Sequence, residues 1–189
     1  MADQLATPDD LALILGLDSA DDRCTLLAEC GTAVVQGVVG GQRIVFVADD
    51  TFGLMGTVDR WLQLPQWPVA QGDVTDVTVD DQDVIDFKQF GARLWRSCGW
   101  APNCYEPSFV AGVYSHGYPD GDQGLQLGRS AVLSIVKGAY PPSAGLASES
   151  IDDYTVAYDR LSAQMDASPF LQRALRAQYG SRAGVVRLG

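Results

Sequence analysis

The sequence has little that could carry chemistry. Its 189 residues include one histidine, His116, and neither a Walker-type phosphate loop nor a Gly-x-Ser-x-Gly nucleophile elbow. Ser115 and His116 are neighbours on a predicted strand, so their side chains point to opposite faces and cannot act as nucleophile and base. We therefore expect no enzymatic activity, no catalytic residue and no cofactor. We interpret His116 as a histidine whose hydrogen bonds are satisfied at a strand end.

Long apolar runs and positive charge are also scarce. No apolar run approaches the ~20 residues of a membrane span, and the chain start lacks the positive segment and apolar run of a signal peptide. The net charge is −11, from 24 acidic and 13 basic residues, which argues against nucleic-acid binding over a broad surface. We expect no membrane partner, and a protein that stays in the cytosol until it is used.

Cysteine occurs at four positions: Cys24, Cys30, Cys98 and Cys104. Neither pair has the two-residue spacing of a zinc knuckle, and cytosolic disulfides are rare, so we interpret all four as free thiols. A disulfide between Cys98 and Cys104 and a metal site remain alternatives. The acidic run at residues 73–86 lacks the register of a calcium loop, so we predict a solvated edge with a hairpin turn.

Tryptophan, in contrast, is concentrated in one region. Residues 61–100 contain all four: Trp61, Trp67, Trp95 and Trp100. Aromatic crowding can form a platform for sugars or nucleobases. Tryptophan is also favoured in cores and at subunit interfaces, and we favour that second interpretation.

Four segments have helical patterns. Thr7 and Pro8 form a strong helix start, and a second helix is expected from about residue 19 to Gly40. Gly31 weakens that second helix or lets another helix approach closely. Residues 124–140 form a weakly amphipathic helix, so we expect it to be buried by its own fold or by a neighbouring subunit. A last helix follows Ser168 and ends near residue 180.

The region between the second and third helices is β-rich. Candidate strands cover residues 44–47, 61–64, 75–79, 84–87, 94–96 and 109–116, with a hairpin turn at residues 80–83. The strand at 109–116 has no charge on either face up to His116, so we expect it to be central in its sheet. Alternation at residues 151–158 predicts a later β-hairpin.

The order of these segments resembles the head-to-tail connector (adaptor) proteins of tailed bacteriophages. The resemblance lies in residues 5–11 (Leu-Ala-Thr-Pro-Asp-Asp-Leu), 60–69 (Arg-Trp-Leu-Gln-Leu-Pro-Gln-Trp-Pro-Val), 114–118 (Tyr-Ser-His-Gly-Tyr) and 148–156 (Ser-Glu-Ser-Ile-Asp-Asp-Tyr-Thr-Val). Asp153 stands where the family often has glycine, and the segment from Cys98 to Cys104 is an elaboration.

The expected fold is therefore α+β in a single domain spanning residues 1–189. A helical bundle core would comprise an N-terminal helix pair, a central helix and a C-terminal helix, from residues of about 5–40 and 109–180. An antiparallel β-rich insertion would cover about 42–107, followed later by the β-hairpin. Residues 181–189 would form an extended tail.

The resemblance implies a structural virion protein that forms a ring of about twelve copies beneath the portal vertex. Its partners would be its own copies, the portal protein, and the next neck component, a stopper or tail terminator. DNA would pass through the lumen without sequence-specific binding. The protein would be assembled in the bacterial host cytoplasm and act in the virion neck during genome ejection. The alternatives are another neck or tail-completion protein, such as a tail terminator, and a cytosolic enzyme or ligand-binding domain.

The C-terminal tail is the candidate interface. It combines apolar and basic residues on an otherwise acidic chain: Arg182, Val185, Val186, Arg187 and Leu188. One interpretation is a docking segment that orders against the portal or a neighbouring subunit. The other is a frayed terminus.

Overall fold

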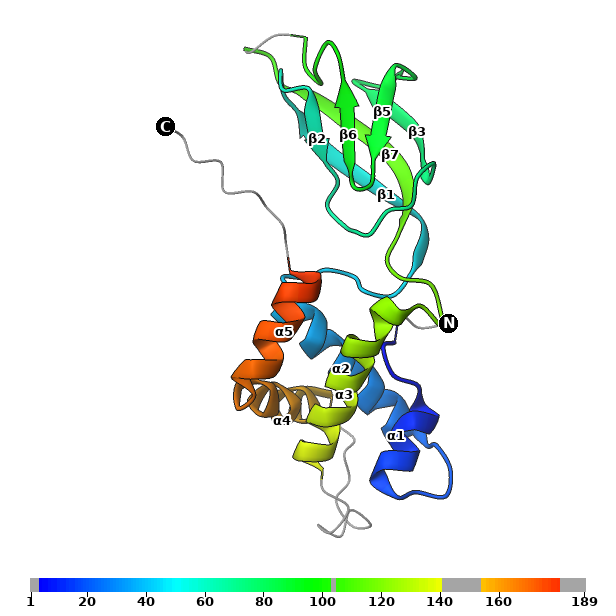
Figure 1. Cartoon of the computed structure of the whole chain (residues 1–189), viewed down its shortest axis with the longest axis vertical. Helices are drawn as coiled ribbons and strands as arrows, with labels where there is room; N and C mark the ends of the chain where they lie inside the picture. The colour runs from blue at the N-terminus through cyan, green and yellow to red at the C-terminus, as the bar shows by residue number, and fades with distance from the viewer. Residues whose placement is uncertain (1–3, 103–104, 141–153, 181–189) are drawn as a thin grey trace. The chain divides into compact units, whose positions relative to one another are not determined.

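The computed structural model describes residues 4–102, 105–140 and 154–180, and its chain forms two compact units. The helical unit comprises residues 1–44 and 121–189, and the β unit comprises residues 45–120 (Figure 1). The class is α+β, as predicted. Residues 109–120 belong to the β unit and not to the helical core, because strand β7 pairs with two strands there.

The helical unit contains α1 (Pro8–Leu15), α2 (Asp22–Val38), the 3-10 turn η1 (Gln123–Leu125), α3 (Gln126–Ala139), α4 (Tyr154–Asp166) and α5 (Pro169–Tyr179). The predicted start of α1 is confirmed. The Thr7 hydroxyl accepts from the Asp10 amide at 3.2 Å, and the Asp10 carboxylate accepts from the Thr7 amide at 3.1 Å. The helix ends at Gly16, whose φ of 72° is a conformation that favours glycine.

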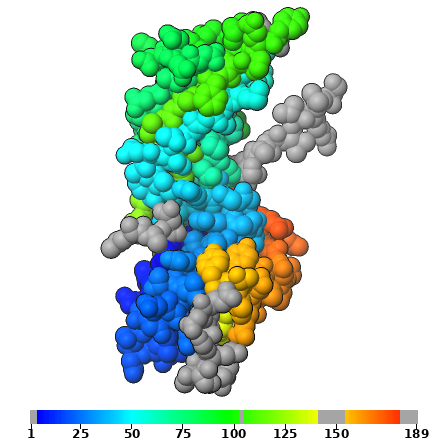
Figure 2. Space-filling view, turned by 180° about the vertical axis from the view of Figure 1, so that it is seen from behind, coloured from blue at the N-terminus to red at the C-terminus, as the bar shows by residue number. Residues whose placement is uncertain are grey.

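Close approach of α2 and α3 depends on Gly31. A Cβ atom at this position would lie 2.7 Å from Cγ1 of Val132, so the two helices meet where α2 has no side chain. Figure 2 shows α4 in orange beside α2 in blue, and these two helices also pack against each other. The core of this unit is completed by apolar residues from all five helices, among them Leu11, Leu27, Ile135, Leu161 and Leu175.

The predicted hairpin at residues 151–158 is wrong where the structure describes it. Residues from Tyr154 onward form α4, while residues 151–153, and the rest of 141–153, lie outside the described residues. The buried residues of α4 are Ala157, Leu161 and Met165, a spacing of four that places them along one face of a helix. Tyr154 and Val156, whose alternation suggested a strand, are exposed on the first turn.

The β unit is built from two antiparallel sheets. The first has the order β1-β7-β3-β4 and contains β1 (Val47–Gly56), β7 (Ser108–His116), β3 (Val74–Val79) and β4 (Gln82–Asp83). The second has the order β2-β6-β5 and contains β2 (Trp61–Gln63), β6 (Arg93–Arg96) and β5 (Phe87–Phe90). It lies in front of β1 and β7 in Figure 1.

The uncharged strand β7 is central, as predicted, between β1 and β3. Its side chains alternate, so that Val110 and Tyr114 point into the core and Phe109 points out. That core also contains Phe52, Leu62, Leu94 and Trp100 among its buried residues. The predicted turn after β3 is confirmed: Asp80 and Asp81 have φ of 49° and 61°, the left-handed pair that a two-residue hairpin loop needs.

Candidate interaction surface

His116 does not form a catalytic pair with Ser115. Its ring is buried, and Nε2 lies 2.9 Å from Oδ2 of Asp50 on β1. Its Nδ1 is buried and has no hydrogen-bond partner among the described residues. The prediction that the hydrogen bonds of His116 are satisfied is therefore correct for Nε2 and wrong for Nδ1. Ser115 is on the other face of β7, where its hydroxyl accepts from the Asp49 amide at 3.3 Å.

The thiols of Cys24, Cys30 and Cys98 are free. Burial, with the charge of Glu29 added, raises the pKa of the Cys30 thiol to about 11, so this thiol stays protonated at neutral pH. Cys98 is exposed, and Cys104 lies outside the described residues. Within residues 4–102, 105–140 and 154–180, no group of three or more His, Cys, Asp or Glu side chains is placed to hold a metal ion.

Charged contacts in the helical unit reinforce helix starts. Arg129 of α3 reaches Asp10 of α1 at 2.6 Å. Partial burial of Asp10 opposes its ionisation, but hydrogen bonds from Arg129 and Thr7 outweigh this effect and lower the pKa of the carboxyl. At α2, the Cys24 amide donates to Asp21 at 2.9 Å and lowers the pKa of that capping carboxyl. These contacts stabilise the fold and give no sign of chemistry.

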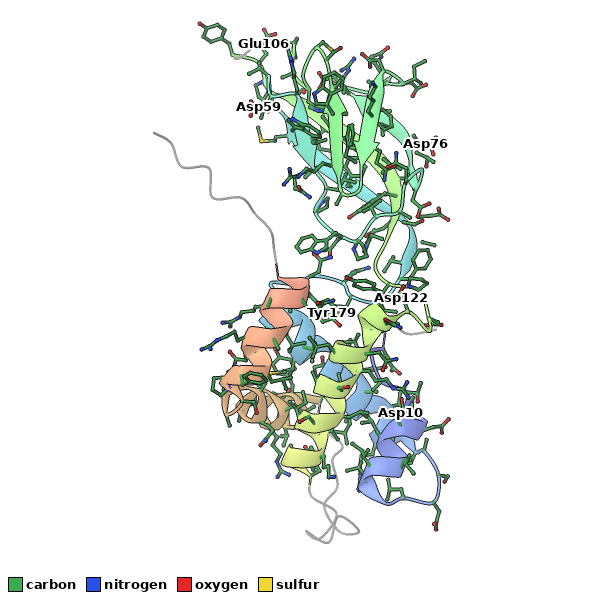
Figure 3. All side chains as sticks on the ribbon, in the orientation of Figure 1. Asp10, Asp59, Asp76, Glu106, Asp122 and Tyr179 are labelled. Atoms are coloured by element: carbon green, nitrogen blue, oxygen red, sulfur yellow. The ribbon has the colours of Figure 1, made fainter. Side chains whose placement is uncertain are left out.

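The predicted burial of the central helix is confirmed, and the chain itself provides it. Ala131, Val132, Ile135 and Val136 are buried, and α3 packs against α1, α2, α4 and α5. Tyr179 of α5, labelled in Figure 3, closes the start of α3: its hydroxyl donates to the Gly124 carbonyl and accepts from the Gly128 amide. A neighbouring subunit is therefore not needed to cover this helix.

The four tryptophans divide between the core and the surface. Trp100 is fully buried, and its indole N–H donates to the Arg60 carbonyl at 3.2 Å. Trp67 is half-buried. Trp61 and Trp95 lie opposite each other on β2 and β6 and are both on the outer side of the three-stranded sheet, because Leu62 and Leu94 fill the inner side. Core packing therefore explains only part of the cluster.

We call the outer side of the sheet β2-β6-β5 the aromatic face. The register places three aromatic and three polar side chains on it, with no acidic residue: Trp61, Gln63, Lys88, Phe90, Arg93 and Trp95. The Trp61 and Phe90 rings have centroids 5.5 Å apart, and Lys88 Nζ lies 5.9 Å from the centre of the Trp95 ring. Arg93 Nε donates to Gln63 Oε1 at 3.1 Å.

The aromatic face is exposed although it is rich in apolar surface. Trp61 is 50% exposed and lies opposite Trp95, and Phe90 is 55% exposed and lies opposite the charged Arg93. Trp, Phe and Arg are enriched where proteins bind each other, so this composition indicates an interaction surface. The sequence shows where the tryptophans gather but not the face, because β2 and β5 become neighbours of β6 only through the sheet order.

The residues proposed from the sequence as an interface lie outside the described residues. They are Arg182, Val185, Val186, Arg187 and Leu188. Among the described residues, no helix is both long enough and apolar enough to cross a membrane. The sequence matches no protein-family model, and no curated protein is significantly similar to it.

Proposed function

We propose that this chain is a structural protein of a tailed-bacteriophage virion, a head-to-tail adaptor that assembles as a ring below the portal. In this role it joins the DNA-filled capsid to the neck and tail and lines the DNA exit channel. Its partners are its own copies, the portal protein, the next neck component, and DNA held without sequence-specific contacts. It acts without a cofactor and does not catalyse a reaction.

The observation that carries the proposal is the order of elements along the chain. Two helices come first, a continuous β segment follows, and the central and last helices then complete the helical unit. This is the order on which the resemblance to phage adaptors rests, apart from the hairpin that α4 replaces. The order supports a family resemblance and does not identify a binding residue.

Surface composition supports assembly independently. In the β unit, Met55, Trp61, Ile85, Phe90 and Phe109 are each at least half exposed. A monomeric protein that carries a net charge of −11 gains nothing from such apolar exposure, whereas subunit contacts would bury it.

Sedimentation of the purified chain, alone and mixed with its portal protein, tests this proposal. We expect rings with a central hole in negative-stain images, either from the chain alone or templated by the portal. A compact monomer that does not bind portal at micromolar concentration would refute the adaptor role. A ring that binds tail tubes but not portal would instead indicate a tail terminator.

A further inference from the structure

A second feature of the β unit complements the aromatic face. The segment from the β3–β4 turn to the start of β5, which we call the acidic tip, carries four aspartates and one isoleucine: Asp80, Asp81, Asp83, Ile85 and Asp86. Ile85 is 94% exposed although it directly follows the buried Val84. An aliphatic side chain thus projects from an acidic segment into solvent.

Two carboxylates of the acidic tip are available to a partner. Asp80 accepts from the Phe109 amide at 2.7 Å, and Asp86 is paired with Arg96 at 2.8 Å. Asp81 and Asp83 are exposed, and neither takes part in an ion pair among the described residues. The tip therefore presents an isoleucine next to two negative charges that the fold does not use.

The aromatic face spans all three strands of the sheet β2-β6-β5, and the acidic tip precedes β5, at one edge of that sheet. Trp61 is on β2, the edge strand of the order β2-β6-β5, and Ile85 precedes β5, the other edge strand. Ile85 is nevertheless almost fully exposed, and Trp61 and Phe90 are half exposed, so the tip does not cover the aromatic face of its own chain.

We propose that the aromatic face binds the acidic tip of a second copy of this chain. Ile85 would lie against Trp61 and Phe90, and Lys88 and Arg93 would pair with Asp81 and Asp83. The contact would bury both exposed apolar groups and match opposite charges. Because the two surfaces consist of different residues, the contact from the face of one copy to the tip of the next is heterologous, and it can repeat from copy to copy and close into a ring or continue as a filament.

Charge favours a second copy over a nucleic acid as the occupant. Residues 45–120 contain eleven acidic and four basic residues, and only Lys88 and Arg93 lie on the aromatic face. A phosphate backbone would be attracted by two cations and repelled by the rest of the unit. The acidic tip brings its negative charge on one short segment that also supplies an apolar side chain.

Site-specific photo-cross-linking tests the contact on the full chain. A benzophenone amino acid replaces Phe90 on the aromatic face, or Phe109 in a matched variant. Phe109 is 54% exposed and lies on the outer side of the other sheet. At about 100 μM protein, we expect the probe at Phe90 to form covalent dimers, with the cross-link mapped by mass spectrometry to residues 80–86. A probe at Phe90 that yields no dimer, or maps elsewhere, would overturn the proposal.

Charge reversal gives a second test that does not depend on the probe. Lys88→Glu alters only the face, and Asp83→Lys alters only the tip. Each variant should self-associate at least about tenfold more weakly than the natural chain, because like charges then meet at every contact. An equimolar mixture of the two variants should assemble again. The altered face of Lys88→Glu can then meet the altered tip of Asp83→Lys, and the natural Lys88 of the second variant can meet the natural Asp83 of the first.

The control is Asp159→Lys, which makes the same charge change on α4 in the helical unit. It should leave self-association unchanged. A mixture that fails to recover, or a control that is equally impaired, would show that total charge and not this contact controls assembly. Saturable quenching of tryptophan fluorescence by oligothymidylate, lost in Lys88→Glu, would assign the face to single-stranded nucleic acid and overturn the proposal.

This inference rests on the proposed function only for the biological setting of the assembly. Rings that bind portal but give no cross-link between Phe90 and the acidic tip would refute the contact and leave the adaptor role intact. Dimers linked through this contact, from a protein that does not bind portal, would refute the adaptor role and leave the contact intact.

Discussion

Replacing Gly31 by alanine tests the packing of α2 against α3. Alanine is a better helix former than glycine by about 1 kcal/mol, so the change would stabilise an isolated helix. Here its Cβ would lie 2.7 Å from Cγ1 of Val132, closer than two carbon atoms can approach. Overpacking of this kind costs about 1–3 kcal/mol. We therefore expect Gly31→Ala to lower the free energy of unfolding by about 0–2 kcal/mol.

Gly37 provides a matched control in the same helix. It is exposed, and the nearest atom to an added Cβ would be the Tyr158 hydroxyl oxygen at 4.0 Å, an ordinary contact. Gly37→Ala should therefore leave stability unchanged or raise it by up to about 1 kcal/mol, with a smaller gain expected near the helix end. The difference between the two variants, up to about 3 kcal/mol in favour of Gly37→Ala, isolates the contact with Val132.

Urea unfolding followed by far-ultraviolet circular dichroism measures these differences, because the helices dominate that signal. The denaturant slopes must agree between variants for the comparison to hold. Val132→Ala should lower the free energy of unfolding less in the Gly31→Ala background than in the natural chain, because the new methyl group at position 31 fills part of the space that Val132 vacates. The coupling energy between the two substitutions should be about 0.5–3 kcal/mol. If Gly31→Ala proves as stable as Gly37→Ala, the helices do not approach each other at Gly31 and the reasoning fails.

Three further changes test the helix cap, the thiols and the buried histidine. Asp21→Ala should cost about 1 kcal/mol by removing the cap of α2. The pKa of Asp21 is lower in the folded chain than in the unfolded chain. The stability that this carboxylate contributes is therefore present above the unfolded pKa of 3.8 and is lost as pH falls through the lower folded value. Urea unfolding across a pH series measures this loss. With a thiol reagent at neutral pH, the exposed Cys98 should react quickly and the buried Cys30 only after unfolding. Peptide mapping identifies the labelled cysteines, and rapid labelling of Cys30 in the folded chain would contradict its burial. His116→Gln should lower the melting temperature in calorimetry by disturbing the contact with Asp50, whereas an unchanged melting temperature would show that the contact adds nothing to stability.

Local signals predicted the parts of the fold that depend on neighbouring residues. Thr7, Pro8 and Asp10 define the start of α1 through contacts three residues apart, and the structure contains those contacts. The turn at Asp80 and Asp81 is also local, since it depends on the backbone angles of two residues. The absence of charge in β7 predicted its central position, and the strand does pair with β1 on one side and with β3 on the other.

Predictions failed where a short pattern fitted two structures. Five residues from Tyr154 to Tyr158 alternate as a strand would, and only the longer spacing through Leu161 and Met165 identifies the helix. In β3, a bulge between Thr75 and Thr78, with Asp76 at a φ of 50°, interrupts the alternation of a regular strand. At the end of α5, Gly180 is extended with a φ of −62° and does not adopt the left-handed conformation that glycine often has after a helix.

The aromatic face could not be predicted because it depends on pairing between distant segments. Trp61 lies opposite Trp95, and Trp95 lies opposite Lys88, so three strands must be placed in order before these side chains are known to be neighbours. Composition indicated that tryptophans gather in this region. It could not separate the buried Trp100 from the exposed Trp61, since both positions follow polar or glycine residues in short apolar segments.

The division of the helical unit between two chain segments has a consequence for synthesis on the ribosome. Residues 1–44 emerge first, but the helices that cover α2 come from residues beyond 121. With roughly 135 residues still to be made between the end of the first segment and the end of α5, the apolar side of α2 waits about 7–27 s at usual elongation rates of 5–20 residues per second. The β unit is one continuous segment and can fold during that interval. We therefore expect nascent chains in which residues 45–120 have left the ribosome, but α3 has not, to hold a folded β unit and to bind chaperones through α1 and α2.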